Sequence, residues 1–135
     1  GGHICGMMQV TDWEGLYGLP ADIIKSAAPC SGMYELEPVR LSHRNTYLDL
    51  TEGAVARNSS IRQLPVYGPP LTMAWGTGEL DEFQRQNNEF AAAWESAGHK
   101  VDTFILDGLN HFEVGREIFN PDQPIFQNIL KHIGV

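Results

Sequence analysis

The sequence has 135 residues, of which 42% are hydrophobic and 19% are charged, so it can bury a core and does not have the composition of a disordered chain. Its net charge is −8 and it has no cluster of Lys and Arg, which argues against nucleic acid as a partner. No apolar run approaches the roughly 18 residues that a membrane span needs, so we expect no membrane partner.

The first residues of the chain predict a helix. Ile4, Met7 and Met8 recur over residues 2 to 10 with the spacing of a helix that is buried on one side. The chain opens on Gly1-Gly2-His3 with neither a cap nor a strand before this helix.

The next segment predicts a turn and a strand. Residues 20 to 22 are typical of a turn, and we expect a short helical piece from Ile23 onward. Residues 27 to 30 then read as a short apolar strand that ends at Ser31.

Residues 35 to 66 form an irregular stretch. Thr51 and Glu52 predict the start of a short helix, and the rest indicates loops and helical turns. So long a connection between two strands is typical of a cap or a pocket wall. Within and beside it, Tyr34, Leu36 and Tyr47 are our candidates for residues of a substrate pocket.

The second half of the chain alternates strands and helices. Residues 71 to 75 form an apolar run apart from Thr72, which favours a central parallel strand. A helix is predicted from Asp81, as its cap, to Gly98. A strand at 101 to 106 and a closing amphipathic helix, with Phe126 and Ile129 on its apolar face, complete an α/β fold with parallel crossovers.

Glu79 and His111 are the candidate catalytic residues. Each follows a predicted parallel strand, so both should emerge at the same edge of the sheet, where ligands bind in open α/β folds. An acid followed about thirty residues later by a histidine has the chain order of the back part of a Ser, Asp/Glu, His hydrolase. The carboxylate would orient the imidazole, which would take a proton from a nucleophile.

Three other acids lie close to this pair. Asp81 suits a helix cap, Asp107 suits a loop at the strand end, and Glu113 follows the histidine. The choice between Glu79 and Asp81 as the catalytic acid stays open at this point.

Other reactive residue types receive simpler interpretations. Ser31 does not fit a G-x-S-x-G nucleophile motif, because position 29 is proline, so we expect a structural serine at a strand end. His43 could line a pocket, whereas His99 and His132 are expected to face solvent. The five histidines have no paired ligand spacing, so we expect no metal. The two cysteines, Cys5 and Cys30, are expected to act as small buried hydrophobes.

Several segments resemble known hydrolases. Gly1-Gly2-His3 resembles the end of Gly-His-Ser-Ala-Gly-Gly-His, the nucleophile elbow of α/β-hydrolase esterases. Residues 80–86, 90–94 and 110–112 resemble the kynurenine formamidase (arylformamidase) family and related bacterial carboxylesterases.

The resemblance implies that residues 1–135 are the C-terminal part of a single α/β-hydrolase domain. By that match Glu79 takes the acid position, where the family often has aspartate, and His111 is the general base. Gly1 and Gly2 would be the remnant of the elbow, and the serine would lie in a separate upstream piece. The N-terminal half of the hydrolase would then be the partner of this chain, which alone would be inactive. A small-molecule ester or aryl formamide would be the substrate, without a cofactor.

A second hypothesis is a non-catalytic α/β module that binds a small molecule or a protein. The absence of a nucleophile in the sequence favours it, whereas the pairing of Glu79 with His111 favours the hydrolase. On the hydrolase hypothesis the strand at 27 to 30 would have an open edge, so we expect the isolated chain to be poorly soluble. The compartment is not determined by the sequence, and the cytoplasm is favoured.

Overall fold

The structure is a computed structural model that describes residues 1–134, and it has the mixed α/β composition that the sequence predicts. In chain order the elements are α1 (Gly2–Val10), α2 (Trp13–Tyr17), α3 (Glu37–Arg40), α4 (Asn45–Leu48), α5 (Glu52–Asn58), the 3-10 helix η1 (Ser60–Arg62), β1 (Leu71–Gly76), α6 (Asp81–Ser96), β2 (Val101–Leu106), α7 (His111–Glu117) and α8 (Pro124–Ile133). Within this part of the chain, no helix is both long enough and apolar enough to cross a membrane.

The two strands form a parallel sheet. They pair in register from Leu71 opposite Val101 to Gly76 opposite Leu106. Every residue of β1 is buried, as its mostly apolar run predicts, whereas β2 is only partly buried. The prediction of a central parallel strand is therefore confirmed by its pairing and its burial.

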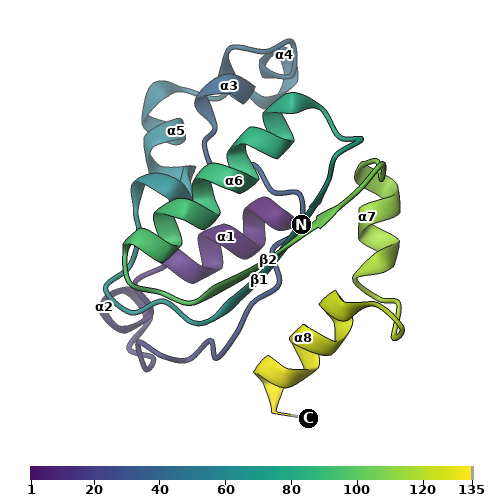
Figure 1. Cartoon of the computed structure of the whole chain (residues 1–135). Coiled ribbons are helices and arrows are strands. Elements are labelled where there is room, and N and C mark those ends of the chain that lie inside the picture. Colours follow the sequence, from purple (N-terminus) through teal and green to yellow (C-terminus); the bar gives the residue numbers. More distant parts are fainter. Residues whose placement is uncertain (135) are drawn as a thin grey trace.

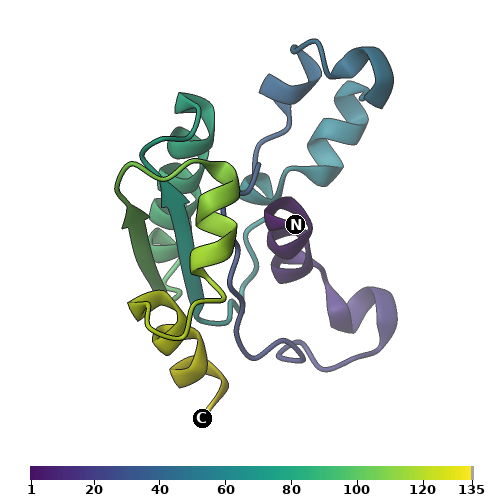
Figure 2. The same cartoon turned by 90° about the vertical axis from the view of Figure 1, so that its right-hand side faces the viewer.

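Helices cover both faces of this sheet (Figures 1 and 2). On one face Met73 and Trp75 of β1 join Phe90 and Trp94 of α6 in the larger core. On the other face a smaller core surrounds Ala74, formed with Val114 of α7 and Ile125 of α8. Because successive strand residues point to opposite faces, β1 contributes side chains to both cores.

The predicted strand at residues 27 to 30 is present only as two isolated parallel bridges to β1. Ala27 pairs with Leu71 and Cys30 pairs with Ala74. Pro29 lies between them, and proline has no amide hydrogen to donate to the ladder. The segment therefore follows the direction of a third strand without completing its hydrogen bonds. The helical piece expected from Ile23 is absent, since residues 23–26 have no regular structure.

Helix α1 has the predicted bounds, but its predicted buried face is wrong. Ile4 is 64% exposed and Met8 is 44% exposed, whereas Gly6 and Gln9 are buried. A Cβ on Gly6 would lie 2.9 Å from the ring of Tyr34, so glycine allows the helix backbone to approach this core aromatic. Close backbone packing, and not apolar side chains, determines which side of α1 faces inward.

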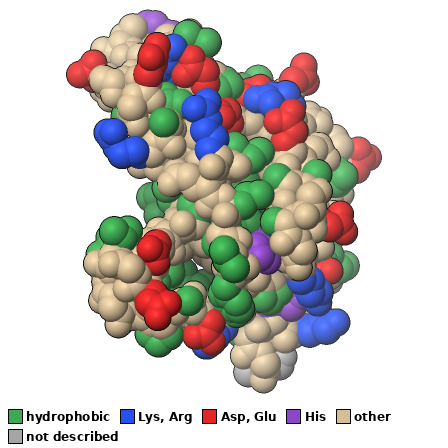
Figure 3. All heavy atoms as spheres, turned by 90° about the vertical axis from the view of Figure 1, so that its left-hand side faces the viewer, with side chains coloured by type: hydrophobic (Ala, Val, Ile, Leu, Met, Phe, Trp, Pro, Cys, Tyr) green, Lys and Arg blue, Asp and Glu red, His purple; other side chains and the backbone are tan. Residues whose placement is uncertain are grey.

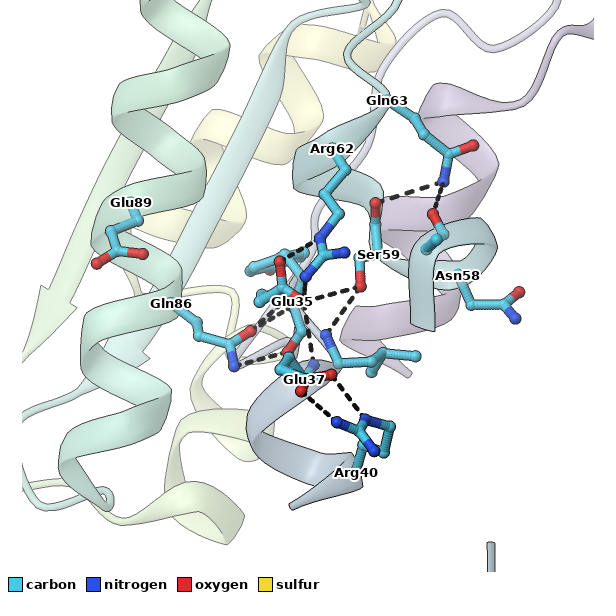
Figure 4. A network of polar contacts seen from close by, with 12 residues as sticks. Glu35, Glu37, Arg40, Asn58, Ser59, Arg62, Gln63, Gln86 and Glu89 are labelled. Atoms are coloured by element: carbon cyan, nitrogen blue, oxygen red, sulfur yellow. Dashed lines mark hydrogen bonds and ion pairs between the residues drawn. The ribbon is translucent and has the colours of Figure 1, made fainter. Parts of the chain in front are cut away.

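The stretch from 35 to 66 is held to the body of the protein by a polar network around Glu35 (Figure 4). Its carboxylate accepts hydrogen bonds from Arg62 at 2.6 and 2.9 Å and from Ser59 at 3.1 Å. Gln86 of α6 accepts from the Tyr34 and Glu35 amides and donates to the Glu35 carbonyl. The short helix predicted from Thr51 is present as α5, with the Thr51 side chain as its cap.

Helix α6 begins where it was predicted to begin, but its N-cap is a different residue. Leu80 is the N-cap, and Asp81 occupies the first turn without capping it. Gln84 does reach back, to the carbonyls of Thr77 and Glu79 at 3.2 and 2.9 Å. This side chain therefore ties the start of the helix to the loop that follows β1.

The expectation that His99 and His132 face solvent is wrong. The His132 side chain is only 5% exposed, and its Nε2 lies 3.1 Å from Asp102 of β2. His99 contacts the Pro65 carbonyl at 2.9 Å and packs against Trp94. His99 follows the end of α6 and His132 lies in the last turn of α8, and helical periodicity alone does not reveal their contacts with distant residues.

Residues 11–24, which include α2, form a lobe that projects from the body of the molecule (Figure 2). Between this lobe and residues 63–69 lies a cavity of about 560 Å³. The space-filling view shows the corresponding hollow with hydrophobic side chains around it (Figure 3).

The Glu35 network should make the fold sensitive to acid. Partial burial raises the pKa of the Glu35 carboxyl, but hydrogen bonds from Arg62, the Glu37 amide and Ser59 outweigh it and leave the pKa lowered. The stabilisation is therefore complete above the usual carboxyl pKa of 4.5 and is lost as the pH falls through the lowered value. We expect Glu35→Gln to cost about 1 kcal/mol at pH 7 and to reduce this acid sensitivity. Thermal unfolding from pH 7 to pH 3 measures both, with the exposed Glu95→Gln as control, and an unchanged pH dependence would contradict the assignment.

Candidate active site

Three residues from three strand ends meet at one edge of the sheet. Ser31 follows the bridging segment, Glu79 follows β1, and His111 follows β2. Glu79 Oε1 accepts a hydrogen bond from Ser31 Oγ at 2.6 Å and lies 3.1 Å from His111 Nδ1. An ionised carboxylate only accepts, so this contact fixes the proton of a neutral His111 on Nδ1 and leaves Nε2 as the basic nitrogen.

The acid and the histidine differ sharply in accessibility. The Glu79 side chain has no exposed surface, whereas the His111 side chain is 47% exposed. Phe83 of α6 packs against the imidazole, with ring centroids 4.7 Å apart. The carboxylate is thus shielded from water, while the histidine can be reached from outside.

Two loops must touch closely for Glu79 to reach His111. A Cβ on Gly76 would overlap the carbonyl of Leu109, and a Cβ on Gly78 would lie 2.7 Å from the Gly108 carbonyl oxygen. The Gly78 amide donates to the Leu109 carbonyl at 3.1 Å. Glycine at 76 and 78 is therefore required by the approach of the two backbones.

Hydrogen bonds of Thr77 connect the same two loops. Its hydroxyl donates to Asp107 at 3.0 Å and accepts from the Gly108 amide at 2.7 Å. Asp107 thus shapes the loop, as expected from its place at the strand end.

His111 is the first residue of a helix that the sequence analysis missed. Asn110 caps α7 by accepting from the amides of Phe112 and Glu113, and the Glu113 side chain accepts from the Asn110 amide. The sequence signal was available, because Asn followed three residues later by Glu is a capping box. This box holds the start of α7 and therefore the position of the imidazole.

The other candidate acids do not contact His111. Asp81 is exposed in the first turn of α6, Asp107 bonds to Thr77, and Glu113 belongs to the capping box. Among the contacts of residues 1–134, the carboxylate beside His111 is that of Glu79. The geometry thus supports the choice of Glu79 over Asp81.

A cavity of about 290 Å³ opens beside the imidazole. Its lining residues come from the start of α1, the bridging segment and α7: Gly1, Gly2, Cys5, Ala28, Cys30, Ser31, His111, Gly115 and Ile118. The two glycines proposed as the elbow remnant therefore lie in the same cavity as the histidine.

Cys30 in this cavity is a poor nucleophile. Burial, followed by the negative charge of Glu79, raises the pKa of its thiol to about 12. Burial also raises the pKa of Cys5. Because the thiolate is the reactive form, neither cysteine is suited to covalent catalysis.

The predicted pocket residues lie away from this cavity. Tyr34 is fully buried and stacks on Phe90 at 4.1 Å, and Leu36 is buried in a separate small cluster with Val39. Tyr47 is 68% exposed. His43 is exposed as well, and residues 1–134 contain no group of three His, Cys, Asp or Glu side chains arranged to hold a metal ion.

Comparison with known proteins adds to this geometry. The chain is similar to kynurenine formamidases. It is 32% identical over 139 aligned positions to the kynurenine formamidase of Danio rerio and 29% identical over 140 to that of Salmo salar. Each alignment covers 99% of this chain and 47% of the relative, so the chain spans about half the length of these curated relatives. No model of a known protein family matches the chain.

Solved structures agree on the fold. A candidate thioesterase from Silicibacter sp. TM1040 superposes with a TM-score of 0.78, at 23% identity, over 94% of this chain and 46% of that protein. A thermophilic esterase of Thermogutta terrifontis gives 0.66, at 19% identity, over 99% and 53%. The predicted fold, the C-terminal half of an α/β hydrolase, is confirmed.

The contact between the two loops can be tested by substitution. In Gly76→Ala the new Cβ would meet the Leu109 backbone, so the loops must separate and Glu79 must withdraw from His111. We expect a loss of about 1–3 kcal/mol in unfolding free energy. Gly115→Ala in α7 meets no atom within 4 Å and should instead be neutral or stabilise by up to about 1 kcal/mol. Denaturant titration of both variants measures this, and equal stabilities would refute the close approach.

Proposed function

We propose that this chain carries the acid and the base of a serine hydrolase that cleaves carboxylic esters or aryl formamides. The observation that carries the proposal is the pairing of buried Glu79 with accessible His111 at the carboxyl edge of a parallel sheet. The similarity to kynurenine formamidases and to esterase structures supports the same reaction class.

In the proposed mechanism His111 moves the proton. Its Nε2 takes the proton of a serine hydroxyl as the oxygen attacks the acyl carbon, and it returns that proton to the leaving amine or alcohol. Water then attacks the acyl enzyme while His111 takes its proton, and His111 returns that proton to the serine oxygen as the carboxylic acid leaves. Glu79 keeps Nδ1 protonated and stabilises the imidazolium, and its burial strengthens that interaction by excluding water.

We place the serine in the N-terminal half of the hydrolase, which would be the partner of this chain. Gly1 and Gly2 lie in the cavity of His111, so a serine two positions before Gly1 would fall within reach of that cavity. The amide after the serine and an upstream loop would supply the oxyanion hole. This chain alone would then be inactive.

The relatives support the proposed substrate class. The two curated relatives are kynurenine formamidases, and esterase 2 of Thermogutta terrifontis is phosphonylated by sarin. An organophosphorus probe that modifies a serine nucleophile therefore suits the proposed reaction. We propose esters and aryl formamides as the substrates, with N-formylkynurenine as one candidate.

A fluorophosphonate probe tests the proposed assembly. We expect native preparations to contain a polypeptide that co-elutes with this chain, takes up the probe and ends in a Gly-x-Ser-x sequence. Size exclusion followed by denaturing intact-mass spectrometry identifies it. Detection of the 15.0 kDa chain alone, without label, would contradict the proposal and favour a binding module.

Loss of the base should abolish turnover. In the assembled enzyme we expect His111→Ala to lower kcat by about 10³-fold or more, because the serine loses its proton acceptor. The exposed His43→Ala is the matched control and should retain the wild-type rate. Hydrolysis of a chromogenic acetate ester measures both, and an active His111→Ala enzyme would rule out His111 as the base.

A further inference from the structure

We propose that Ser31 is a positioning residue, which holds Glu79 and through it orients His111. The consequence for turnover rests on the proposed function, whereas the orientation of the imidazole does not. Ser31 Oγ donates to Glu79 Oε1 at 2.6 Å, and the same oxygen lies 3.1 Å from His111 Nδ1. One carboxylate oxygen therefore joins the serine hydroxyl to the histidine ring.

A backbone hydrogen bond to β1 positions Ser31 beside Glu79. Its amide donates to the Ala74 carbonyl of β1 at 2.9 Å, which fixes the end of the bridging segment beside the central strand. Glu79 follows that same strand after a short turn. Ser31 is 6% exposed, so its hydroxyl is largely shielded from water that would compete for the bond.

The conformation of Ser31 is strained. Its φ is +45°, a left-handed value that few residues other than glycine adopt. Glycine at position 31 would adopt this conformation without steric cost. A serine that keeps a strained backbone while its hydroxyl bonds a buried carboxylate has the character of a functional residue.

Glu79 has few other supports for its side chain. No donor among residues 1–134 reaches its second oxygen, Oε2, which is fully buried. The two polar contacts of the Glu79 side chain are thus with Ser31, which is buried, and with His111, whose side chain is 47% exposed. Without the hydroxyl, the carboxylate would be held only by the residue that it is meant to orient.

Replacement by glycine separates this role from a structural one. Ser31→Gly removes one of the two polar contacts of the buried carboxylate but also relieves the backbone strain, so the thermal midpoint should fall less than in Ser31→Ala. In the assembled enzyme we expect kcat to fall about 10- to 100-fold, as for a lost hydrogen bond to a charged group, with KM unchanged within about twofold. Ser31→Ala should lose the same activity while keeping the strain, and Ser31→Gly carries the test if the alanine variant fails to fold.

Two controls sharpen the comparison. Ser59 is another buried serine, and its hydroxyl accepts from the Leu36 amide, so Ser59→Ala should lower the thermal midpoint without lowering kcat. In a Glu79→Gln background, Ser31→Gly should have little further effect on kcat, because Ser31 acts through Glu79. Additive losses in the double variant would overturn the proposal.

A measurement without turnover distinguishes failure of this proposal from failure of the proposed function. The Nδ1 proton of His111 should give an NMR resonance that exchanges slowly in the wild type and at least about tenfold faster in Ser31→Gly. Faster exchange in a protein without hydrolase activity would leave Ser31 as a positioning residue and refute the function. An active Ser31→Gly enzyme with unchanged exchange would overturn the role of Ser31.

Discussion

A carboxylate removed from water is the constraint on which the site depends. Desolvation of a charged group costs on the order of several kcal/mol unless hydrogen bonds replace the lost water. Glu79 has no exposed side-chain surface, and both of its polar contacts, with Ser31 and His111, use Oε1. The proton on Nδ1 of the histidine ring follows from this one oxygen.

The fold is arranged to bring three strand ends to that oxygen. Because β1 is central, the bridging segment and β2 lie on its two sides, and their carboxyl ends emerge together. Gly76 and Gly78 then allow the loop after β1 to lie against the loop after β2. The capping box at Asn110 starts α7 at the histidine itself. Backbone contacts, more than side-chain contacts, therefore set the geometry of the pair.

Periodicity predicted the elements that carry apolar patterns. The strands at 71–76 and 101–106 and the helices α6 and α8 follow from runs and spacings that are local in the sequence. The buried face of α1 could not be read in this way, because close packing of Gly6 on Tyr34 is a tertiary contact.

The site was predictable in part for the same reason. Strand-end positions identified Glu79 and His111 as neighbours, since the ends of parallel strands share one edge. The role of Ser31 depends on a left-handed backbone and a contact 48 positions away, and neither leaves a local signal. The burial of His132 against Asp102 likewise depends on how α8 docks onto the sheet.

The identity of the acid is the central claim, and paired substitutions test it most directly. Hydrolysis rates of the assembled enzyme would be compared for Glu79→Gln and Asp81→Asn, two changes that remove one charge while nearly preserving shape. The account predicts a loss in kcat of about 10²-fold or more for Glu79→Gln, by analogy with loss of a triad acid, and wild-type turnover for Asp81→Asn. A normal rate for Glu79→Gln together with a crippled Asp81→Asn enzyme would contradict it.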